Sequence, residues 1–260
     1  RKNINTNIIA ITGSCGKTTL KELLVKSLKK ISKVSFSPKS YNNKYGVPLS
    51  LFNLNQNNEY GVLEVGMDKK GEIDYLSKII QPDVSVITNI NYAHAKNFKN
   101  INHIALAKSE IINNTRTSGF VVLNADDNFF EFHRNLAYKK NLPVVSFGIK
   151  TQKADIKLIS IKREHKKFKL NIKVNKKNSC FLVSNDFQNN IYNILASLAV
   201  MSIYINILKL NKNIFANFKA PQGRGDISKI KINNKNLNLI DESYNSNPLS
   251  LKSAIINYDK

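Results

Sequence analysis

The chain has 260 residues, with 40 Lys and Arg against 18 Asp and Glu, which gives a formal net charge of +22. No stretch approaches the roughly 18 consecutive apolar residues of a membrane span, and the first residues lack the apolar core of a secretory signal, so we expect neither membrane insertion nor secretion. The two cysteines, Cys15 and Cys180, lie far apart and outside any C-x-x-C pattern, which argues against a disulfide framework or a cysteine zinc site and favours a reducing, cytoplasmic setting.

The positive charge comes almost entirely from lysine. The chain has 35 Lys but only five Arg, together with 38 Asn and 31 Ile, and a joint excess of Lys, Asn and Ile is typical of codon usage in an AT-rich genome. Base-specific contacts depend heavily on the forked guanidinium of Arg. We therefore expect no nucleic-acid partner. The alternative from a different functional class is a basic P-loop ATPase that binds DNA or RNA with a steep dependence on salt.

Strands and helices alternate over the first 150 residues. An apolar run at residues 8–11 ends in a glycine-containing loop, and leucines at helical spacing follow it. Further strands are predicted at residues 60–65, 84–88, 120–123 and 144–147, and helices at residues 71–80, 101–112 and 126–138. This order predicts an α/β fold with a mostly parallel, P-loop NTPase-like sheet flanked by helices on both faces.

The pattern changes after residue 150. Short strands with period-two alternation between residues 154 and 183 predict a small antiparallel appendage on the main sheet, over about residues 151–185. A long apolar helix at residues 190–208, a short helix at residues 214–218 and a strand at residues 237–240 follow. The last strand leads through Pro248 to a final predicted helix.

A phosphate-binding loop is predicted where the first strand ends. Its glycines would let backbone N–H groups turn inward around phosphate oxygens at a helix N-terminus, while the Lys17 ammonium reaches the β- and γ-phosphates and the Thr18 hydroxyl holds Mg²⁺. The loop departs from the usual motif because Ile11 stands five positions before the second glycine. A purely structural turn between strand and helix is the alternative. The candidate nucleotide-binding residues are Gly13, Ser14, Cys15, Gly16, Lys17, Thr18 and Thr19.

Other polar side chains follow the predicted strands. Glu64 ends a buried strand, where a carboxylate points into the crevice in which parallel sheets bind ligands, and it could hold Mg²⁺ or merely cap the next loop. His94 follows the next strand on the same rim and is a candidate metal or phosphate ligand. Lys108 lies within an apolar helix face, where a lysine usually extends to solvent. The remaining histidines, with no such context, are expected at the surface: His103, His133 and His165.

A polar segment, Asp241-Glu-Ser-Tyr-Asn-Ser-Asn-Pro248, follows the late strand. Its adjacent carboxylates could bind a ribose or a polar substrate, although a capped turn explains the same residues.

Taken together, these blocks resemble the Mur ligase family, the ATP-dependent amide-forming enzymes of peptidoglycan assembly. They keep the family order over nearly the whole chain, and three of them favour the member that adds D-alanyl-D-alanine over its amino-acid-adding relatives. The matching blocks are Thr12–Thr19, Asn42–Pro48, Leu63–Ile73, Thr88–Ile90 with Ala93–His94, Ala105–Ile111, Asn124–Asp126, Asn190–Asn193, Gly223–Arg224 and Asp241–Pro248.

The resemblance implies ATP and Mg²⁺ as cofactors, and it assigns roles to single residues. Lys17 and Thr18 would serve the ATP phosphates and Mg²⁺, and Glu64 and His94 the metal ions. Lys108 matches a lysine that several relatives carbamylate to hold a second Mg²⁺. Lys17, Glu64, His94 and Lys108 are thus the candidate catalytic residues.

The downstream blocks carry the remaining assignments. Asn193 matches the adenine-contacting position, Arg224 a phosphate-contacting arginine, and Asp241 with Glu242 an acidic pair near the ribose. Asn43 lies in the segment expected to approach the muramyl-peptide substrate. Two departures occur: Phe187-Gln-Asn-Asn190 replaces the usual Gly-x-His-Asn, and Asp241-Glu242 replaces the more frequent Asp-Asp.

The resemblance also implies a domain organisation. Residues 1–235 would be the central ATP-binding domain and residues 236–260 the truncated start of a C-terminal Rossmann-like domain, with the N-terminal UDP-binding domain absent from this chain. The implied substrates are UDP-N-acetylmuramoyl-tripeptide and D-alanyl-D-alanine, joined through an acyl phosphate. We expect a monomer that binds nucleotide weakly and completes no turnover by itself. Within the enzyme class, an amino-acid-adding Mur ligase or a folylpolyglutamate synthase is the alternative.

Overall fold

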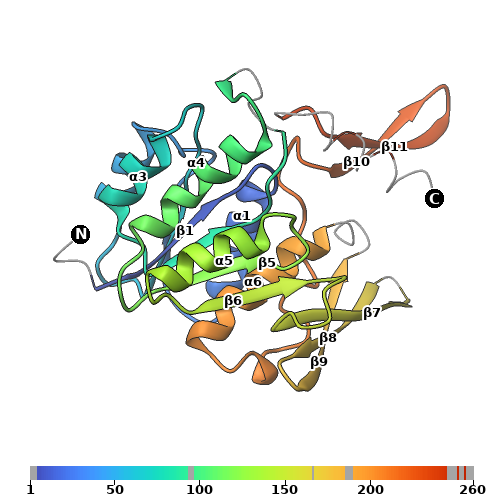
Figure 1. Cartoon of the computed structure of the whole chain (residues 1–260). Helices are drawn as coiled ribbons and strands as arrows, with labels where there is room; N and C mark the ends of the chain where they lie inside the picture. The colour runs from blue at the N-terminus through green and yellow to red at the C-terminus, as the bar shows by residue number, and fades with distance from the viewer. Residues whose placement is uncertain are drawn as a thin grey trace.

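The computed structural model describes residues 5–92, 97–165, 167–184 and 190–244, together with residues 251 and 255. In this part of the chain, one large sheet has nine strands in the order β2-β3-β1-β4-β5-β6-β7-β8-β9 (Figure 1). The strands are β1 (Asn7–Thr12), β2 (Val34–Phe36), β3 (Tyr60–Glu64), β4 (Val84–Ile87), β5 (Phe120–Asn124), β6 (Val144–Gly148), β7 (Ile156–Glu164), β8 (Lys167–Val174) and β9 (Lys177–Ser184). Pairing is parallel from β2 to β7 and antiparallel from β7 to β9, so the predicted antiparallel appendage is confirmed as a direct continuation of the main sheet.

Helices cover both faces of the parallel part of the sheet, as the alternating pattern predicts. In Figure 1, α3, α4 and α5 lie on the face toward the viewer, and α1 and α6 lie behind the sheet, where they contact each other. The helices are α1 (Lys17–Leu28), α2 (Gly46–Phe52), α3 (Glu72–Ile80), α4 (Ile101–Asn113), α5 (Phe130–Lys139) and α6 (Ile191–Tyr204), with a 3-10 turn, η3 (Ile207–Lys209).

The central strand β1 shows why helices must cover both faces of the sheet. Alternate side chains of a strand point to opposite faces, and here both sets are apolar and fully buried. Ile9 and Ile11 join the core beneath α1 and α6, whereas Ile8 and Ala10 join the core beneath α3 and α4. A strand buried on both faces has a continuous apolar sequence, which is what residues 8–11 show.

Several element boundaries differ from the sequence-based prediction. The helix expected from residue 126 begins at Phe130, because the Asp127 carboxylate accepts hydrogen bonds from the N–H groups of Ile90 and Phe129 and holds a turn there. The helix expected over residues 190–208 ends at Tyr204. Residues 214–218 form successive turns rather than a helix, although their apolar side chains are buried. Strand β2 and helix α2 were not predicted.

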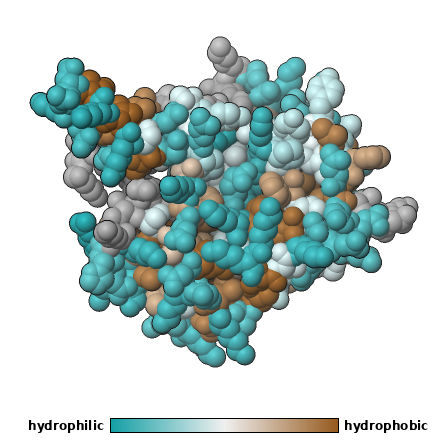
Figure 2. All heavy atoms as spheres, turned by 180° about the vertical axis from the view of Figure 1, so that it is seen from behind, coloured by the Kyte–Doolittle hydropathy of each residue, from teal (hydrophilic) through white to brown (hydrophobic). Residues whose placement is uncertain are grey.

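A separate hairpin follows the large sheet. Strands β10 (Asp226–Ile232) and β11 (Lys235–Asp241) pair antiparallel, from Asp226 with Asp241 to Ile232 with Lys235. The domain boundary expected between residues 235 and 236 therefore falls just after the turn of this hairpin, between the first two residues of β11. Figure 2 shows apolar side chains along the hairpin on an otherwise largely hydrophilic face, and Ile232, Leu237 and Leu239 are about half exposed. None of the helices in the described residues is long and apolar enough to span a membrane.

Candidate active site

The predicted phosphate loop connects β1 to α1, and its two glycines are required by the geometry. Gly13 has φ 145° and Gly16 has φ 82°, a left-handed conformation that other residues adopt at a cost. A Cβ atom on Gly13 would lie 1.8 Å from Oγ1 of Thr88, and one on Gly16 would lie 2.8 Å from Oδ1 of Asn193. The loop therefore passes too close to Thr88 for a side chain at position 13, and the positive φ disfavours one at position 16.

The segment after β4 holds the loop in place. The N–H groups of Ser14 and Cys15 donate to the carbonyl and side-chain oxygens of Asn89, at 2.9 and 3.0 Å. The Thr88 hydroxyl donates to the Cys15 carbonyl at 2.6 Å, and the Asn91 N–H donates to the Ser14 hydroxyl at 2.9 Å. Because Asn89 occupies the amides of Ser14 and Cys15, an anion would be bound by other donors, among them those at the start of α1, where no side chain caps the helix.

Lys17 folds back over this loop. Its ammonium donates to the carbonyl oxygens of Gly13 at 2.9 Å and Ser14 at 3.4 Å. Burial lowers the pKa of Lys17 from its ordinary value, and the nearby Glu64 carboxylate opposes that effect. The loop thus presents a partly buried cation whose partners are neutral carbonyls, and phosphate oxygens could replace these partners with a gain in charge complementarity.

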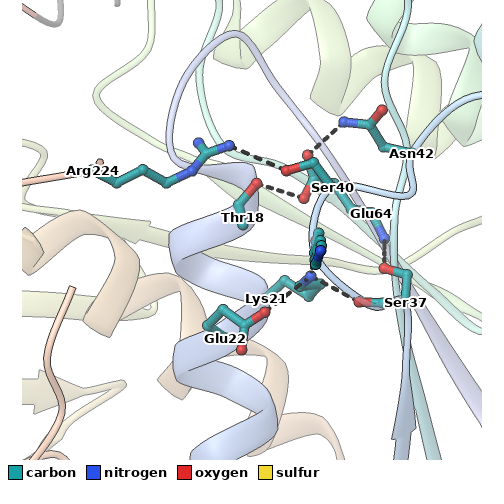
Figure 3. Close-up of polar contacts among 9 residues, drawn as sticks. Thr18, Lys21, Glu22, Ser37, Ser40, Asn42, Glu64 and Arg224 are labelled. Carbon is teal, nitrogen blue, oxygen red and sulfur yellow. Dashed lines mark hydrogen bonds and ion pairs between the residues drawn. The ribbon is translucent and has the colours of Figure 1, made fainter. Parts of the chain in front are cut away.

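The first turn of α1 meets the end of β3 at a buried carboxylate. The Thr18 hydroxyl donates to Oε2 of Glu64 at 2.6 Å, and the Asn42 side-chain amide donates to Oε1 at 2.8 Å. The Ser37 hydroxyl accepts a hydrogen bond from the Glu64 N–H at 3.1 Å. Figure 3 shows Thr18 and Asn42 reaching the carboxylate from opposite sides. Glu64 is 1% exposed, so these contacts replace water around its charge.

This pair of oxygen donors suits Mg²⁺. Mg²⁺ is commonly held by one or two carboxylates together with phosphate oxygens and water, and a threonine hydroxyl next to the phosphate loop is a typical companion ligand. The described residues contain no group of three or more His, Cys, Asp or Glu side chains that could hold a metal by themselves. Thr18 and Glu64 thus supply two oxygen ligands, to which bound phosphates and water would add others.

Lys108 is buried, contrary to the usual behaviour of a lysine in a helix. It lies on α4 with 2% of its surface exposed, and burial followed by repulsion from Lys17 holds its pKa well below the ordinary value. The predicted ligand His94 lies outside the described residues. His133 was expected at the surface, but it is buried between α5 and α4, where Nε2 lies 3.2 Å from the Ala105 carbonyl oxygen, and burial lowers its pKa.

Asn193 lies against the phosphate loop, as its proximity to Gly16 shows. It sits in the first turn of α6, and its amide donates to Oδ1 of Asn190 at 3.0 Å. Asn193, the predicted adenine-contacting residue, thus lies beside the loop. The departure noted upstream, at residues 187–189, lies outside the described residues.

The adjacent Tyr192 ties the start of α6 to a second carboxylate, Asp126. The Asp126 oxygens accept from the Tyr192 hydroxyl at 3.0 Å and from the N–H groups of Ile149, Lys150 and Thr151 at 2.6 to 3.1 Å. Burial opposes ionisation of Asp126, but the hydrogen bonds from Lys150, Ile149 and Thr151 outweigh it and lower its pKa to about 2. Asp126 therefore links three segments, which are the turn after β5, the turn after β6 and the start of α6.

Arg224 and the acidic pair lie on the polar segments around the hairpin. Arg224 donates to the Ser40 hydroxyl at 3.4 Å, stacks over Tyr244 at 4.4 Å, and lies close enough to Lys17 to disfavour its charge. Asp241 accepts from the Ser243 N–H at 2.9 Å, and hydrogen bonds from the Ser243 side chain and backbone lower its pKa. Burial and the nearby Asp226 and Asp241 raise the pKa of Glu242. Neither Asp241 nor Glu242 makes a described hydrogen bond to the phosphate loop.

The segment after β2 contributes more than the sequence indicated. The predicted substrate residue Asn43 is exposed, and its side-chain oxygen accepts from the N–H groups of Tyr45 and Gly46 at the start of α2. Its neighbour Asn42 contacts Glu64 instead. In the sequence, both asparagines belong to the same motif block. No local feature shows that Asn42 contacts Glu64 while Asn43 is exposed.

The chain was compared with known proteins. Residues 11–201 match the family described as Mur ligase middle domain. The UDP-N-acetylmuramoyl-tripeptide--D-alanyl-D-alanine ligase of Buchnera aphidicola subsp. Baizongia pistaciae is 33% identical over 98% of this chain and 54% of that protein. The ligase of the same name from Buchnera aphidicola subsp. Acyrthosiphon pisum is 40% identical over 59% of this chain and 33% of that protein.

Among solved structures, the MurF ligase from Thermotoga maritima in complex with ADP superposes with a TM-score of 0.85 and 28% identity, over 98% of this chain and 57% of that one. The chain thus spans about half the length, or less, of these relatives. The phosphate loop, Thr18, Glu64 and Asn193 all lie within the matched range of residues 11–201. On the strength of that match, which covers most of its length, the chain belongs to the Mur ligase family.

Proposed function

We propose that this chain is the ATP-binding part of a ligase that adds D-alanyl-D-alanine to UDP-N-acetylmuramoyl-tripeptide. The observation that carries the proposal is the buried contact between Thr18 and Glu64 at the base of the phosphate loop. It combines a phosphate-binding turn with oxygen ligands for Mg²⁺ in one place. Support for the choice of substrates comes from the relatives and the solved structure that share the ligase name.

The proposed reaction has two steps. A carboxylate oxygen of the tripeptide bonds to the γ-phosphorus of ATP and ADP leaves, which gives an acyl phosphate. The amine of D-alanyl-D-alanine then bonds to the acyl carbon, the C–O bond to phosphate breaks, and the amine loses a proton as inorganic phosphate departs. Both steps move negative charge between oxygens, so catalysis depends on positioning and on positive charge rather than on a side-chain nucleophile.

The residues present can supply that positive charge. Lys17 would exchange the carbonyls of Gly13 and Ser14 for phosphate oxygens, and Arg224 would add a second cation on the same side. When bound, Mg²⁺ would neutralise phosphate charge and polarise the transferring group. Thr18 and Glu64 would hold the ion, and Asn42 would keep the carboxylate oriented toward it.

Lys108 fits a second role in the same site. We propose that its amine is carbamylated, a step in which the neutral nitrogen bonds to the carbon of CO₂ and releases a proton. Burial beside Lys17 disfavours the charged ammonium and so supplies the neutral amine that this step needs. The product is an anion, which would remove a buried positive charge and provide oxygen ligands for a second metal ion.

The domain organisation is also a proposal. Residues 1–235 would form the ATP-binding domain and residues 236–260 would begin the domain that binds the incoming amine. The family match to residues 11–201 supports the first assignment. The hairpin of β10 and β11 would then join the two domains, since its strands fall on either side of the proposed boundary. We place the enzyme in the cytoplasm, in agreement with its low cysteine content.

The test measures ADP release by the full-length protein with UDP-N-acetylmuramoyl-tripeptide and D-alanyl-D-alanine, each omitted in turn. Sustained ADP release over many turnovers should require both substrates, because the acyl phosphate formed in the first step is consumed only by the amine. Glu64→Gln preserves the shape of the side chain but removes its charge, and should lower turnover at least about a hundredfold. The matched control is Glu131→Gln, a surface carboxylate on α5.

Two results would contradict the proposal. Turnover that depends on a free amino acid in place of D-alanyl-D-alanine, or on a folate substrate, would assign the chain to another ligase of the superfamily. Undiminished turnover of Glu64→Gln would remove Glu64 from the metal site.

A further inference from the structure

Helix α1 carries a second lysine whose charge is buried, one turn after Lys17. Lys21 is among the largest fully buried side chains of the described residues, with 0% of its surface exposed. Its ammonium donates to the Ser37 carbonyl at 2.8 Å and to the Lys39 carbonyl. It also pairs with Oε1 of Glu22 at 3.0 Å, a carboxylate that is partly exposed.

A buried ammonium at this position is energetically unfavourable unless its surroundings compensate its charge. Lys21 lies next to apolar side chains of α1, because Leu20, Leu24 and Leu28 belong to the core. Burying a charge costs free energy unless hydrogen bonds satisfy it, and a methionine or leucine would fill the same space without that cost. Unlike these apolar side chains, the lysine has N–H donors. They bind the main-chain carbonyls of Ser37 and Lys39, in a segment that is neither helix nor strand.

That segment, residues 37–43, forms the wall of the proposed metal site. Its first residue, Ser37, accepts from the N–H of Glu64, and Asn42 near its end donates to the Glu64 carboxylate. The Asn42 carbonyl accepts from the Gly66 N–H at 2.7 Å, and Ser40 between them accepts from Arg224. Figure 3 shows Lys21 beneath this segment, on the same helix as Thr18.

We propose that Lys21 is a positioning residue: its ammonium holds residues 37–43 against α1, and through Asn42 it fixes the orientation of the Glu64 carboxylate. The inference rests on the proposed function. The Lys21 ammonium contacts the carbonyls of Ser37 and Lys39 and the Glu22 carboxylate, so its effect on the site passes through residues 37–43.

The position of Lys21 predicts which kinetic constants change. The phosphate loop is held by Thr88 and Asn89, not by residues 37–43, so ATP affinity should depend little on Lys21. By contrast, the orientation of the Glu64 carboxylate and the position of the segment that leads to Asn43 should depend on Lys21. Loss of the ammonium should therefore raise the Mg²⁺ concentration needed for half-maximal activity and the KM for the muramyl-peptide, and lower kcat.

The experiment compares Lys21→Met with Lys26→Met in the full-length protein. Lys26 is an exposed lysine on the same helix, so its replacement makes the same chemical change outside the buried network. We expect Lys21→Met to lower kcat/KM for the peptide on the order of tenfold to a hundredfold. ADP affinity, measured by calorimetry without Mg²⁺, should stay within about twofold, because the phosphate loop keeps its own hydrogen bonds. Lys26→Met should match the wild-type protein in every measurement.

A double-mutant cycle with Asn42→Ala tests whether Lys21 acts through Asn42. If it does, the combined variant should be hardly slower than the worse single variant. Losses in kcat/KM that multiply would overturn that route, and wild-type Mg²⁺ dependence and peptide KM in Lys21→Met would overturn the proposal.

A second variant covers the case in which Lys21→Met does not fold. Lys21→Arg keeps the charge and the donors and should show the same pattern with a smaller amplitude. If Lys21→Arg has wild-type constants while Lys21→Met only unfolds at a lower temperature, Lys21 is merely structural. Failure of the proposed function is distinguishable, because the wild-type protein would then show no turnover with these substrates.

Discussion

Replacing Asp126 with asparagine tests whether this carboxylate holds together the turn after β5, the turn after β6 and the start of α6. In the wild-type protein its two oxygens accept hydrogen bonds from Ile149, Lys150, Thr151 and Tyr192. Asparagine keeps one acceptor oxygen, but it removes the charge and turns an amide donor toward groups that are donors themselves. The variant should therefore be less stable than the wild-type protein at neutral pH.

The expected magnitude follows from the pKa of Asp126. The hydrogen bonds lower this pKa from an ordinary 3.8 to about 2. At about 1.36 kcal/mol per pH unit, the difference corresponds to roughly 2.4 kcal/mol of stabilisation of the ionised form. The carboxylate is partly accessible to solvent, which screens its interactions, so we expect about 1 to 2 kcal/mol in the free energy of unfolding.

The sign of the pH dependence is fixed by the direction of the shift. The folded-state pKa lies below the unfolded-state value, so the stabilisation is fully present above about pH 5 and is lost as the pH falls through about 4 toward 2. The difference in stability between wild type and Asp126→Asn should thus be constant from pH 7 to pH 5. It should shrink at lower pH.

Urea unfolding followed by circular dichroism measures this difference, since the chain has no tryptophan for fluorescence. The control is Glu164→Gln, which removes a surface carboxylate 3.7 Å from Lys169 and should cost at most about 0.5 kcal/mol. A loss below about 0.5 kcal/mol for Asp126→Asn at pH 7, or a loss that stays the same down to pH 3, would refute the reasoning.

Two further predictions concern the phosphate loop and Lys108. Gly13→Ala should cost several kcal/mol in urea unfolding because its Cβ would lie 1.8 Å from a threonine hydroxyl, whereas Gly71→Ala, with φ 88° but no atom within 4 Å, should cost only about 1 kcal/mol. Equal losses would show that the loop moves to accept the methyl group. Carbon-13-labelled bicarbonate should give a carbamate signal in the NMR spectrum of the full-length protein that is absent from Lys108→Met, and it should raise wild-type activity in CO₂-depleted buffer. A wild-type spectrum without that signal would contradict carbamylation.

Much of the fold could be predicted from local patterns. The apolar run at residues 8–11, the glycine loop and the leucines of α1 each carry their own signal, because a strand buried on both faces and a helix with one buried face leave different periodicities. Strand β2 and helix α2 were missed because they are short. Each takes its conformation from neighbours, β2 from its pairing with β3 and α2 from the Asn43 side chain at its start.

Local patterns in the sequence also predicted part of the candidate site. Motif spacing identified Gly13, Gly16, Lys17 and Thr18, since the chemistry of a phosphate loop lies within one short segment. Glu64 was identified from its place at the end of a buried strand. The structure brings these residues together, and their roles in binding stay predictions, as does that of His94, which lies outside the described residues.

The sequence by itself therefore determined the parallel sheet, the phosphate loop and the carboxylate at the end of β3. The tertiary structure alone decided that Asn42 rather than Asn43 meets Glu64, that Lys21 is buried, and that Asp126 reaches Tyr192. The physical reason is that a hydrogen bond between distant segments depends on which carbonyls and carboxylates the packed core brings within about 3 Å. No local pattern of residues records that distance.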